Sequence, residues 1–191
     1  AHSIPHSMNK IPEMVWLKKR DGSAEFWAVG HKGLDGGNAP WTHYLQISAN
    51  SIEDDNVVIF NDTAPTTTHF SVGTDGSVNN SGNNYIAMLF ASVAGISKVG
   101  TYDGSSSTQT IECGFQPRFL IQKRVNGTGE WHVLDTTRGW GSGNDNWLSL
   151  ESTDAQSSYD FGAPTSSGFT ITGSNNSVSN TGGKYIYYAH A

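Results

Sequence analysis

An internal repeat constrains the fold of this chain more than any other feature of its sequence. The segment SVNNSGNNYIAMLFA, residues 77–91, has a counterpart in SVSNTGGKYIYYAHA, residues 177–191. The segment from Ile11 lies over the segment from Gln116 without a gap, and Ala-Pro-Thr precedes a Phe in both halves. Three similar segments in the same order indicate a duplication.

We place the two repeats at about 6–93 and 113–191, joined by a connecting hairpin at about 94–112. The second repeat is preceded by GTYDGSSS, which has no counterpart ahead of the first repeat. We therefore expect the chain to be a fragment of a longer polypeptide.

Each repeat has the pattern of short strands separated by turns. An extended apolar segment (14–19 and 119–124) meets an Asp-Gly or Asn-Gly turn. Both dipeptides favour hairpins, because both central residues of the tight turn need positive φ. Later in each repeat HFSVG and GFTITG alternate apolar and polar residues, as half-buried strands do. No segment of about ten residues has a helical period, so we predict an all-β chain.

We predict an antiparallel β-sandwich, jelly-roll or lectin-like, in which two pseudo-symmetric internal repeats form a single β domain over residues 1–191. About six strands per repeat leave an apolar face that the other repeat would cover. Large aromatic residues recur at matching places and are expected to pack in the core. The matched pairs are Phe26 and Trp131, Tyr44 and Trp147, Phe70 and Phe169, and Tyr85 and Tyr185.

Composition excludes several classes of protein. The 191 residues carry a net charge of -6, which opposes nucleic-acid binding because a binder needs a basic face. The single cysteine, Cys113, excludes an internal disulfide and a cysteine-rich zinc site. No apolar run approaches the roughly 20 residues of a membrane helix, so we expect no membrane insertion.

No residue pattern predicts catalysis, a cofactor or a resident metal. His2 and His6 have metal-like spacing but no third ligand nearby, and SIEDDN at 51–56 lacks the alternating acids of a calcium loop. Whether calcium binds stays open. Glu130 and Asp135 are candidates for a glycosidase pair, but Glu130 recurs beside the hairpin turn of the first repeat, which favours a structural role. We therefore expect that the chain is not an enzyme.

The loops after each first hairpin differ between the repeats and carry Trp41 and Trp140. Aromatic residues on variable loops above a rigid scaffold are typical of a binding surface. We expect these two indoles, with Trp27 as a weaker candidate, to form exposed patches that stack on sugar rings. Nearby polar residues would contact hydroxyl groups: Asp35, Asn38, Asn144 and Asp145. In the alternative, the indoles only cover an open end of the sandwich.

Three segments together identify a resemblance: GTYDGSSSTQTIECGFQPRFLIQKR, NDTAPTTTHFSVG and NNSGNNYIAMLFASVAGISKVGTYDG. They resemble a repeat domain of tail-fibre and other virion structural proteins of marine and cyanobacterial phages. The resemblance covers nearly the whole chain and implies a module on the virion surface, in a tail fibre or another appendage. It implies other virion proteins as partners and a homo-oligomer, with a trimer favoured by analogy. No catalytic or binding residue is carried over.

The function that we prefer from these observations is recognition of host-surface polysaccharide by a virion module, with many copies giving avidity. The alternative is a purely structural spacer or decoration domain that binds only protein. A polysaccharide depolymerase is a distant third. Burial of the loop tryptophans would favour the spacer.

Overall fold

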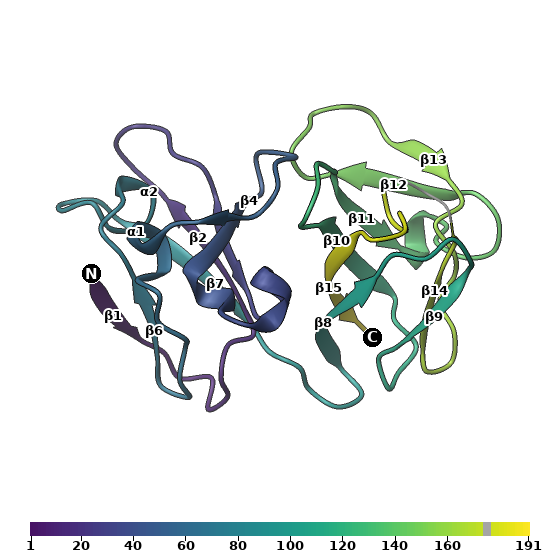
Figure 1. Cartoon of the computed structure of the whole chain (residues 1–191), viewed down its shortest axis with the longest axis horizontal. Helices are drawn as coiled ribbons and strands as arrows, with labels where there is room; N and C mark the ends of the chain where they lie inside the picture. Colours follow the sequence, from purple (N-terminus) through teal and green to yellow (C-terminus); the bar gives the residue numbers. More distant parts are fainter. Residues whose placement is uncertain (174–176) are drawn as a thin grey trace. The chain divides into compact units, whose positions relative to one another are not determined.

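The computed structural model describes residues 1–173 and 177–191 and has an all-β, sandwich-like fold of antiparallel sheets (Figure 1). The chain divides into two compact units, residues 1–91 and 92–191. In Figure 1 the first runs from purple to teal and the second from teal to yellow. The boundary lies two residues before the predicted end of the first repeat. Packing of the two units into one domain stays a prediction.

The first unit contains a five-stranded sheet in the order β5-β4-β3-β2-β7 and a two-stranded sheet of β1 and β6. Its strands are β1 (His2–Pro5), β2 (Met14–Lys19), β3 (Ala28–His31), β4 (His43–Gln46), β5 (Asp54–Asp55), β6 (His69–Val72) and β7 (Tyr85–Phe90). Two single-turn helices, α1 (Val57–Phe60) and α2 (Gly76–Asn79), were not expected from the sequence. Each begins at a capping side chain: Asn56 accepts from the backbone N–H of Val58, and Asp75 from that of Ser77.

The second unit contains a six-stranded sheet in the order β13-β12-β11-β10-β15-β8 and a two-stranded sheet of β14 and β9. Its strands are β8 (Ser97–Asp103), β9 (Gln109–Glu112), β10 (Phe119–Arg124), β11 (Trp131–Asp135), β12 (Asp145–Ser149), β13 (Ser157–Tyr159), β14 (Gly168–Ile171) and β15 (Lys184–His190). The predicted connecting hairpin at 94–112 is wrong, because β8 pairs with β15 and β9 pairs with β14. Its two strands join different sheets.

The strand orders of the two units correspond position by position. Without β8, the main sheet of the second unit has the order β13-β12-β11-β10-β15, which matches β5-β4-β3-β2-β7 of the first unit strand by strand. The small sheet of β9 and β14 corresponds to the small sheet of β1 and β6. The second unit therefore has one strand, β8, for which the first unit has no counterpart among the described residues.

The register of the sheets corrects the gapless alignment of the repeats. Leu17 lies opposite Ala28 in the first unit, and its counterpart Gln122 lies opposite His132 in the second. The first unit therefore holds one extra residue between β2 and β3, and Trp27 rather than Phe26 corresponds to Trp131. Backbone hydrogen bonds agree, since the carbonyl of Trp27 accepts from Ile47 and that of Trp131 from Leu150.

The first hairpin turn of each unit is also wider than predicted. β2 and β3 are joined by residues 20–27, and β10 and β11 by residues 125–130. Gly22 has a positive φ of 76°, whereas Asp21, Asn126 and Gly127 do not fall among the residues with positive φ. The strands pair as predicted, but the tight two-residue turn is wrong.

Each unit has a buried core to which both of its sheets contribute. The core of the first unit contains Val15, Leu17, Ala28, Trp41, Tyr44, Ile59, Phe60, Phe70, Val72 and Val78. The core of the second contains Tyr102, Phe115, Leu120, Leu134, Trp140, Phe161, Phe169, Ile171, Val178, Tyr185, Tyr187 and Ala189. The small sheet of each unit therefore covers one face of its main sheet. No helix in the described part of the chain is long and apolar enough to cross a membrane.

Candidate functional site

Trp41, which we expected to be exposed, is part of the core of the first unit. It lies in the 3-10 helix Pro40–Thr42 and is only 8% exposed. Its ring meets that of Phe60 edge-on, with 5.6 Å between the ring centroids. Gly30 leaves the space for this ring, because a Cβ atom at Gly30 would lie 2.5 Å from Cζ3 of Trp41. The predicted stacking patch at Trp41 is therefore wrong.

Trp140 is buried in the core of the second unit and is 3% exposed. Its indole Nε1–H donates to the carbonyl of Gly162 at 3.0 Å, and its ring meets that of Phe169 edge-on. A buried indole usually has a partner for its N–H, and here the partner belongs to the chain itself. The predicted patch at Trp140 is wrong as well, and burial of both indoles agrees with the alternative that they cover the sandwich.

Asp145, predicted to contact hydroxyl groups, is fully buried. Its carboxylate accepts from the backbone N–H groups of Gly141 at 2.8 Å and Phe161 at 2.9 Å. Burial raises the pKa of Asp145 above its usual range. The carboxylate joins two loop segments of its own unit, so the predicted ligand contact is wrong.

The other predicted polar residues lie nearer the surface. Asp35 has a left-handed backbone, with φ of 49°, and its carboxylate accepts from the backbone N–H of Ala39. Asn38 is exposed and donates to the carbonyl of Asp35. Asn144 is exposed and Trp27 is half-buried. Ligand contacts by these residues stay predictions, and the visible role of Asp35 is to shape its own loop.

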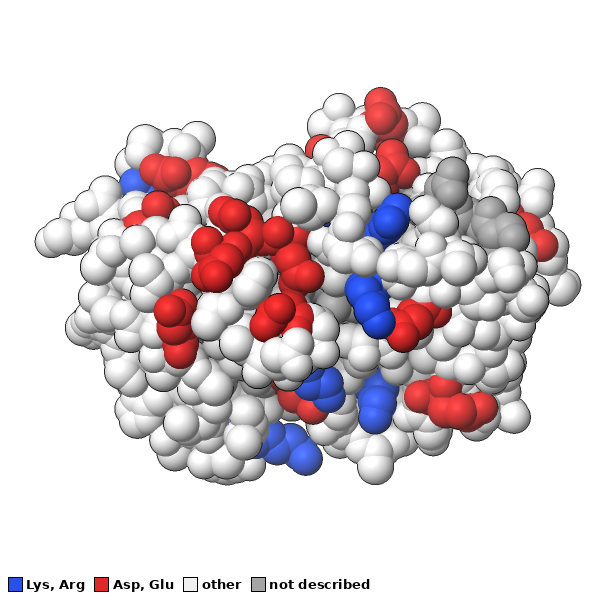
Figure 2. Space-filling model, in the orientation of Figure 1, with Lys and Arg blue, Asp and Glu red and all other residues white. Residues whose placement is uncertain are grey.

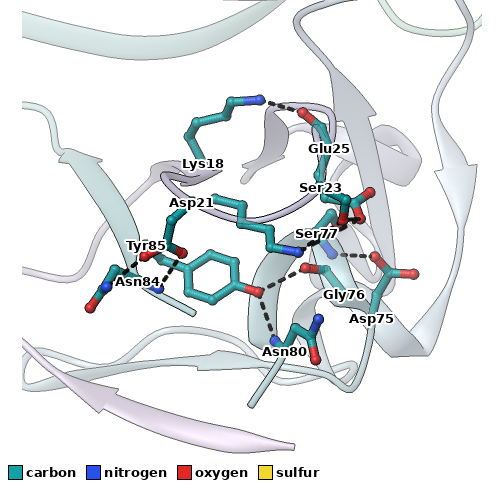
Figure 3. Close-up of polar contacts among 11 residues, drawn as sticks. Lys18, Asp21, Ser23, Glu25, Asp75, Gly76, Ser77, Asn80, Asn84 and Tyr85 are labelled. Atoms are coloured by element: carbon teal, nitrogen blue, oxygen red, sulfur yellow. Dashed lines mark hydrogen bonds and ion pairs between the residues drawn. The ribbon is translucent and has the colours of Figure 1, made fainter. Parts of the chain in front are cut away.

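A polar network in the first unit ties the first hairpin turn to the turn before β7 (Figure 3). The carboxylate of Asp21 accepts from the backbone N–H of Asn84 at 2.8 Å and from its side-chain amide at 2.6 Å. The hydroxyl of Tyr85 accepts from the backbone N–H of Asn80 and donates to the carbonyl of Gly76, both at 2.7 Å. The hydrogen bonds from Asn84 lower the pKa of Asp21. Two turns far apart in the sequence are thus fastened together.

The hairpin turn is also braced from within. Figure 3 shows Lys18 donating to the backbone carbonyl of Glu25. Lys19, which is buried, donates to Ser23 at 3.2 Å and lies 4.0 Å from the carboxylate of Glu25. The matching Glu in the two repeats therefore has a structural contact in the first unit, as its position beside the turn predicted.

The second unit repeats this fastening with different side chains. The side-chain oxygen of Asn126, the counterpart of Asp21, accepts from the backbone N–H of Lys184 at 2.8 Å. The hydroxyl of Tyr185 accepts from the backbone N–H of Asn180 at 2.9 Å. We call each pair of contacts a turn lock. The sequence signal for it is the Asn followed five residues later by Tyr in both copies of the closing segment, together with Asp or Asn before the Gly of the hairpin turn.

The second unit has a hollow of about 240 Å³ at its β13 edge, which was not expected from the sequence. Three strands, β11, β12 and β13, supply most of its wall. Its described lining residues are His132, Trp147, Ser157, Ser158, Tyr159, Phe161 and Ser177. Phe161 meets both Trp147 and Tyr159 edge-on, with ring centroids 5.7 and 5.6 Å apart. Tyr159 is 47% exposed, so an aromatic ring faces solvent at this hollow.

Two side chains that line the hollow, His132 and Trp147, carry buried polar atoms without a hydrogen-bond partner among the described residues. Within the described part of the chain, Nδ1 of His132 and Nε1 of Trp147 are buried without a hydrogen-bond partner. The hydroxyl of Ser149, which lies opposite His132 in the sheet, is also buried without a hydrogen-bond partner in that part of the chain. Nε2 of His132 lies 3.5 Å from the carboxylate of Glu130 and lowers the pKa of that carboxyl. Buried polar atoms without a partner are rare in folded proteins, and each calls for an explanation such as a water or an ion.

Acidic side chains gather on the visible face of the first unit (Figure 2). The first unit has nine acidic and five basic side chains. Glu53 accepts from the backbone N–H of Asp35 at 2.7 Å, and burial raises the pKa of Glu53. Among residues 1–173 and 177–191, no three His, Cys, Asp or Glu side chains are placed to hold one metal ion.

The carboxylates weighed as a glycosidase pair lie too far apart for that chemistry. Glu130 directly precedes β11 and Asp135 ends it, so their Cα atoms lie about 16 Å apart along an extended chain, and the odd spacing puts their side chains on opposite faces of the strand. Glycosidase carboxylates lie about 5–10 Å apart. Asp135 instead pairs with Arg138 at 2.8 Å.

Of three comparisons with known proteins, one found a match. Neither the search of curated proteins nor the search of solved structures found a significant match. One family model, described as a domain of unknown function (DUF7483), matches residues 1–191. The chain therefore belongs to the DUF7483 family over its whole length.

Proposed function

We propose that the chain is a non-enzymatic structural module of a phage particle, which spaces or decorates a tail fibre or another surface appendage. The resemblance of its three ordered segments to virion repeat domains supports the location. One structural observation carries the role: three of the seven residues that the sequence offered as ligand contacts are used to hold the fold. Trp41 and Trp140 lie in the cores, buried Asp145 joins two loop segments, and the same turn lock occurs in both units.

Immunogold electron microscopy tests this proposal. Antibodies against the recombinant chain are applied to particles of the phage that encodes it, with the same antibodies pre-absorbed on the chain as the control. We expect gold at regular positions on an appendage or on the capsid. Gold absent from intact particles, with the chain found only in the soluble fraction of infected cells, would overturn the proposal.

The hollow in the second unit favours a second candidate function, the recognition of host-surface polysaccharide. Its volume of about 240 Å³ lies below the range of sites for drug-sized ligands and suits one sugar ring. The exposed ring of Tyr159 offers a face for stacking. A sugar hydroxyl both donates and accepts, so it would pair with the buried indole N–H of Trp147 and the imidazole of His132 once these side chains turn toward the hollow. A quaternary ammonium ion would fit the rings but leave these atoms unpaired.

Titration with methyl glycosides of glucose, galactose, mannose and N-acetylglucosamine tests this second candidate, with the indole N–H signal of Trp147 as the NMR readout. We expect at least one glycoside to shift the signal at millimolar concentration, and Tyr159→Ala to weaken binding about fivefold. Ile11→Ala, at an exposed position of the first unit, is the control. No shift with any glycoside, or equal shifts in the Tyr159→Ala variant, contradicts it.

A further inference from the structure

The sheet of the first unit ends at a strand with one open edge. β7 pairs with β2, and among the described residues no other strand pairs with it. The sequence of β7, Tyr-Ile-Ala-Met-Leu-Phe, contains no charge and no proline. Proteins usually protect an edge strand with charges, proline or a bulge, because a long apolar edge invites pairing with another chain.

The second unit shows what occupies the corresponding edge. β15 corresponds to β7, since Phe119 lies opposite His190 as Met14 lies opposite Phe90. The free side of β15 is covered by β8 over seven residue pairs, from Lys184 with Asp103 to His190 with Ser97. The two units differ at this edge by the presence of one strand.

Burial of β7 and β15 differs in the way that a missing strand beside β7 predicts. Ile186 and Tyr187 of β15 are 1% and 3% exposed. Their counterparts in β7, Ile86 and Ala87, are exposed, and so is Met88. Ile86 and Met88 are among the large hydrophobic side chains that the chain exposes.

We propose that the open edge of β7 is a docking site for an added antiparallel strand of the β8 type, supplied by another module. The incoming segment would resemble Ser97–Asp103, SKVGTYD, and would pair with β7 as β8 pairs with β15. Strand addition of this kind obtains affinity from backbone hydrogen bonds and specificity from side chains on alternate positions. The inference deepens the proposed structural role by stating how modules join, and the binding step does not depend on the location in a particle.

The added strand meets different neighbours at β7 and at β15 in one position, the place of Gly100. In the second unit Gly100 lies opposite Tyr187, and a Cβ atom at Gly100 would lie 2.5 Å from the ring of Tyr187. The counterpart of Tyr187 in β7 is Ala87, which has no ring to meet that atom. The β7 edge therefore accepts a larger side chain at the place of Gly100, and a β-branched residue there favours the strand conformation.

Peptide titration of the full chain tests the proposal. The peptides are residues 96–104, the same peptide with Gly100→Val and a scrambled control, and the readout is the backbone amide signals of β7. We expect saturable shifts at β7 with the first two peptides, and binding at least as tight with Gly100→Val. Ile86→Lys and Met88→Lys place charges on the edge at exposed positions and should each weaken binding about tenfold. Ile11→Lys, exposed outside the edge, should leave binding unchanged.

Three outcomes overturn the proposal. The first is no shift at β7 with either peptide at millimolar concentration. The second is equal binding by the scrambled peptide. The third is concentration-dependent dimerisation through β7 that the peptides do not displace, because the occupant would then be a second copy of the chain. Failure of peptide binding leaves the immunogold result unaffected, so the two proposals are tested separately.

Discussion

Replacing Trp41 with Ala separates a structural indole from a ligand-binding one. Trp41 is 8% exposed and packs on Phe60, and the loop that carries it shares a core with β3. A binding indole at the surface could be removed with little loss of stability. A core indole cannot, because its removal loses transfer free energy and leaves a cavity.

The expected loss is about 4 kcal/mol, since Trp→Ala replacements in cores cost about 3–5 kcal/mol. That loss lowers the ratio of folded to unfolded chains about a thousandfold. For a unit of this size, 1 kcal/mol shifts the midpoint of thermal unfolding by about 4–8 °C, so we expect a fall of about 20 °C. Because whole domains are stable by only about 5–15 kcal/mol, the first unit would come close to unfolding.

Urea denaturation of the full chain measures the loss, and hydrogen exchange of backbone amides assigns it to residues 1–91. Trp41→Phe keeps a ring in the core and should lose less than Trp41→Ala. Ile52→Ala, at a side chain that is 51% exposed, should change the free energy of unfolding by less than about 0.5 kcal/mol. A loss below about 1 kcal/mol for Trp41→Ala, or one equal to that of Ile52→Ala, would refute the reasoning.

Three further predictions concern stability. Gly30→Ala should cost about 1–3 kcal/mol in urea denaturation, because the added Cβ atom meets the ring of Trp41; an unchanged midpoint would contradict this close contact. Tyr85→Phe should cost about 1 kcal/mol, because it removes the hydroxyl of the turn lock; no loss, and no faster exchange in the turn before β7, would count against the lock. Burial lowers the pKa of Lys123 to about 8, below the value of about 10.4 in an unfolded chain. Between these values the unfolded chain keeps a proton that the folded chain has lost, so the free energy of unfolding should rise by about 2 kcal/mol from pH 7 to 9.5, relative to Lys123→Met; parallel pH curves for the two proteins would disprove it.

Much of the fold followed from the sequence by itself. Alternation of apolar and polar residues located the strands that contain Phe70 and Phe169, and both side chains are buried. The closing segments became β7 and β15, each beginning near a Tyr that holds the preceding turn. These features are local, because a pattern of burial and a turn depend on residues that are close in the sequence.

Only the tertiary structure decided the features that depend on distant partners. Trp41 is buried because Gly30 leaves space for its ring, and Trp140 is buried with its indole N–H bonded to the carbonyl of Gly162. No pattern within a variable loop reports such a cavity or acceptor, so the expectation of exposed indoles was wrong.

The same reason explains the other corrections. The extra residue near Phe26 became visible only through the partners across the sheet, since both alignments place apolar residues in the strand. β8 looked like one half of a hairpin, yet it pairs with β15, a strand that comes more than eighty residues later in the sequence. The partner of β8 is the edge strand of a sheet whose other strands come later in the sequence. The position of that edge is a property of the assembled sheet, which local sequence does not contain.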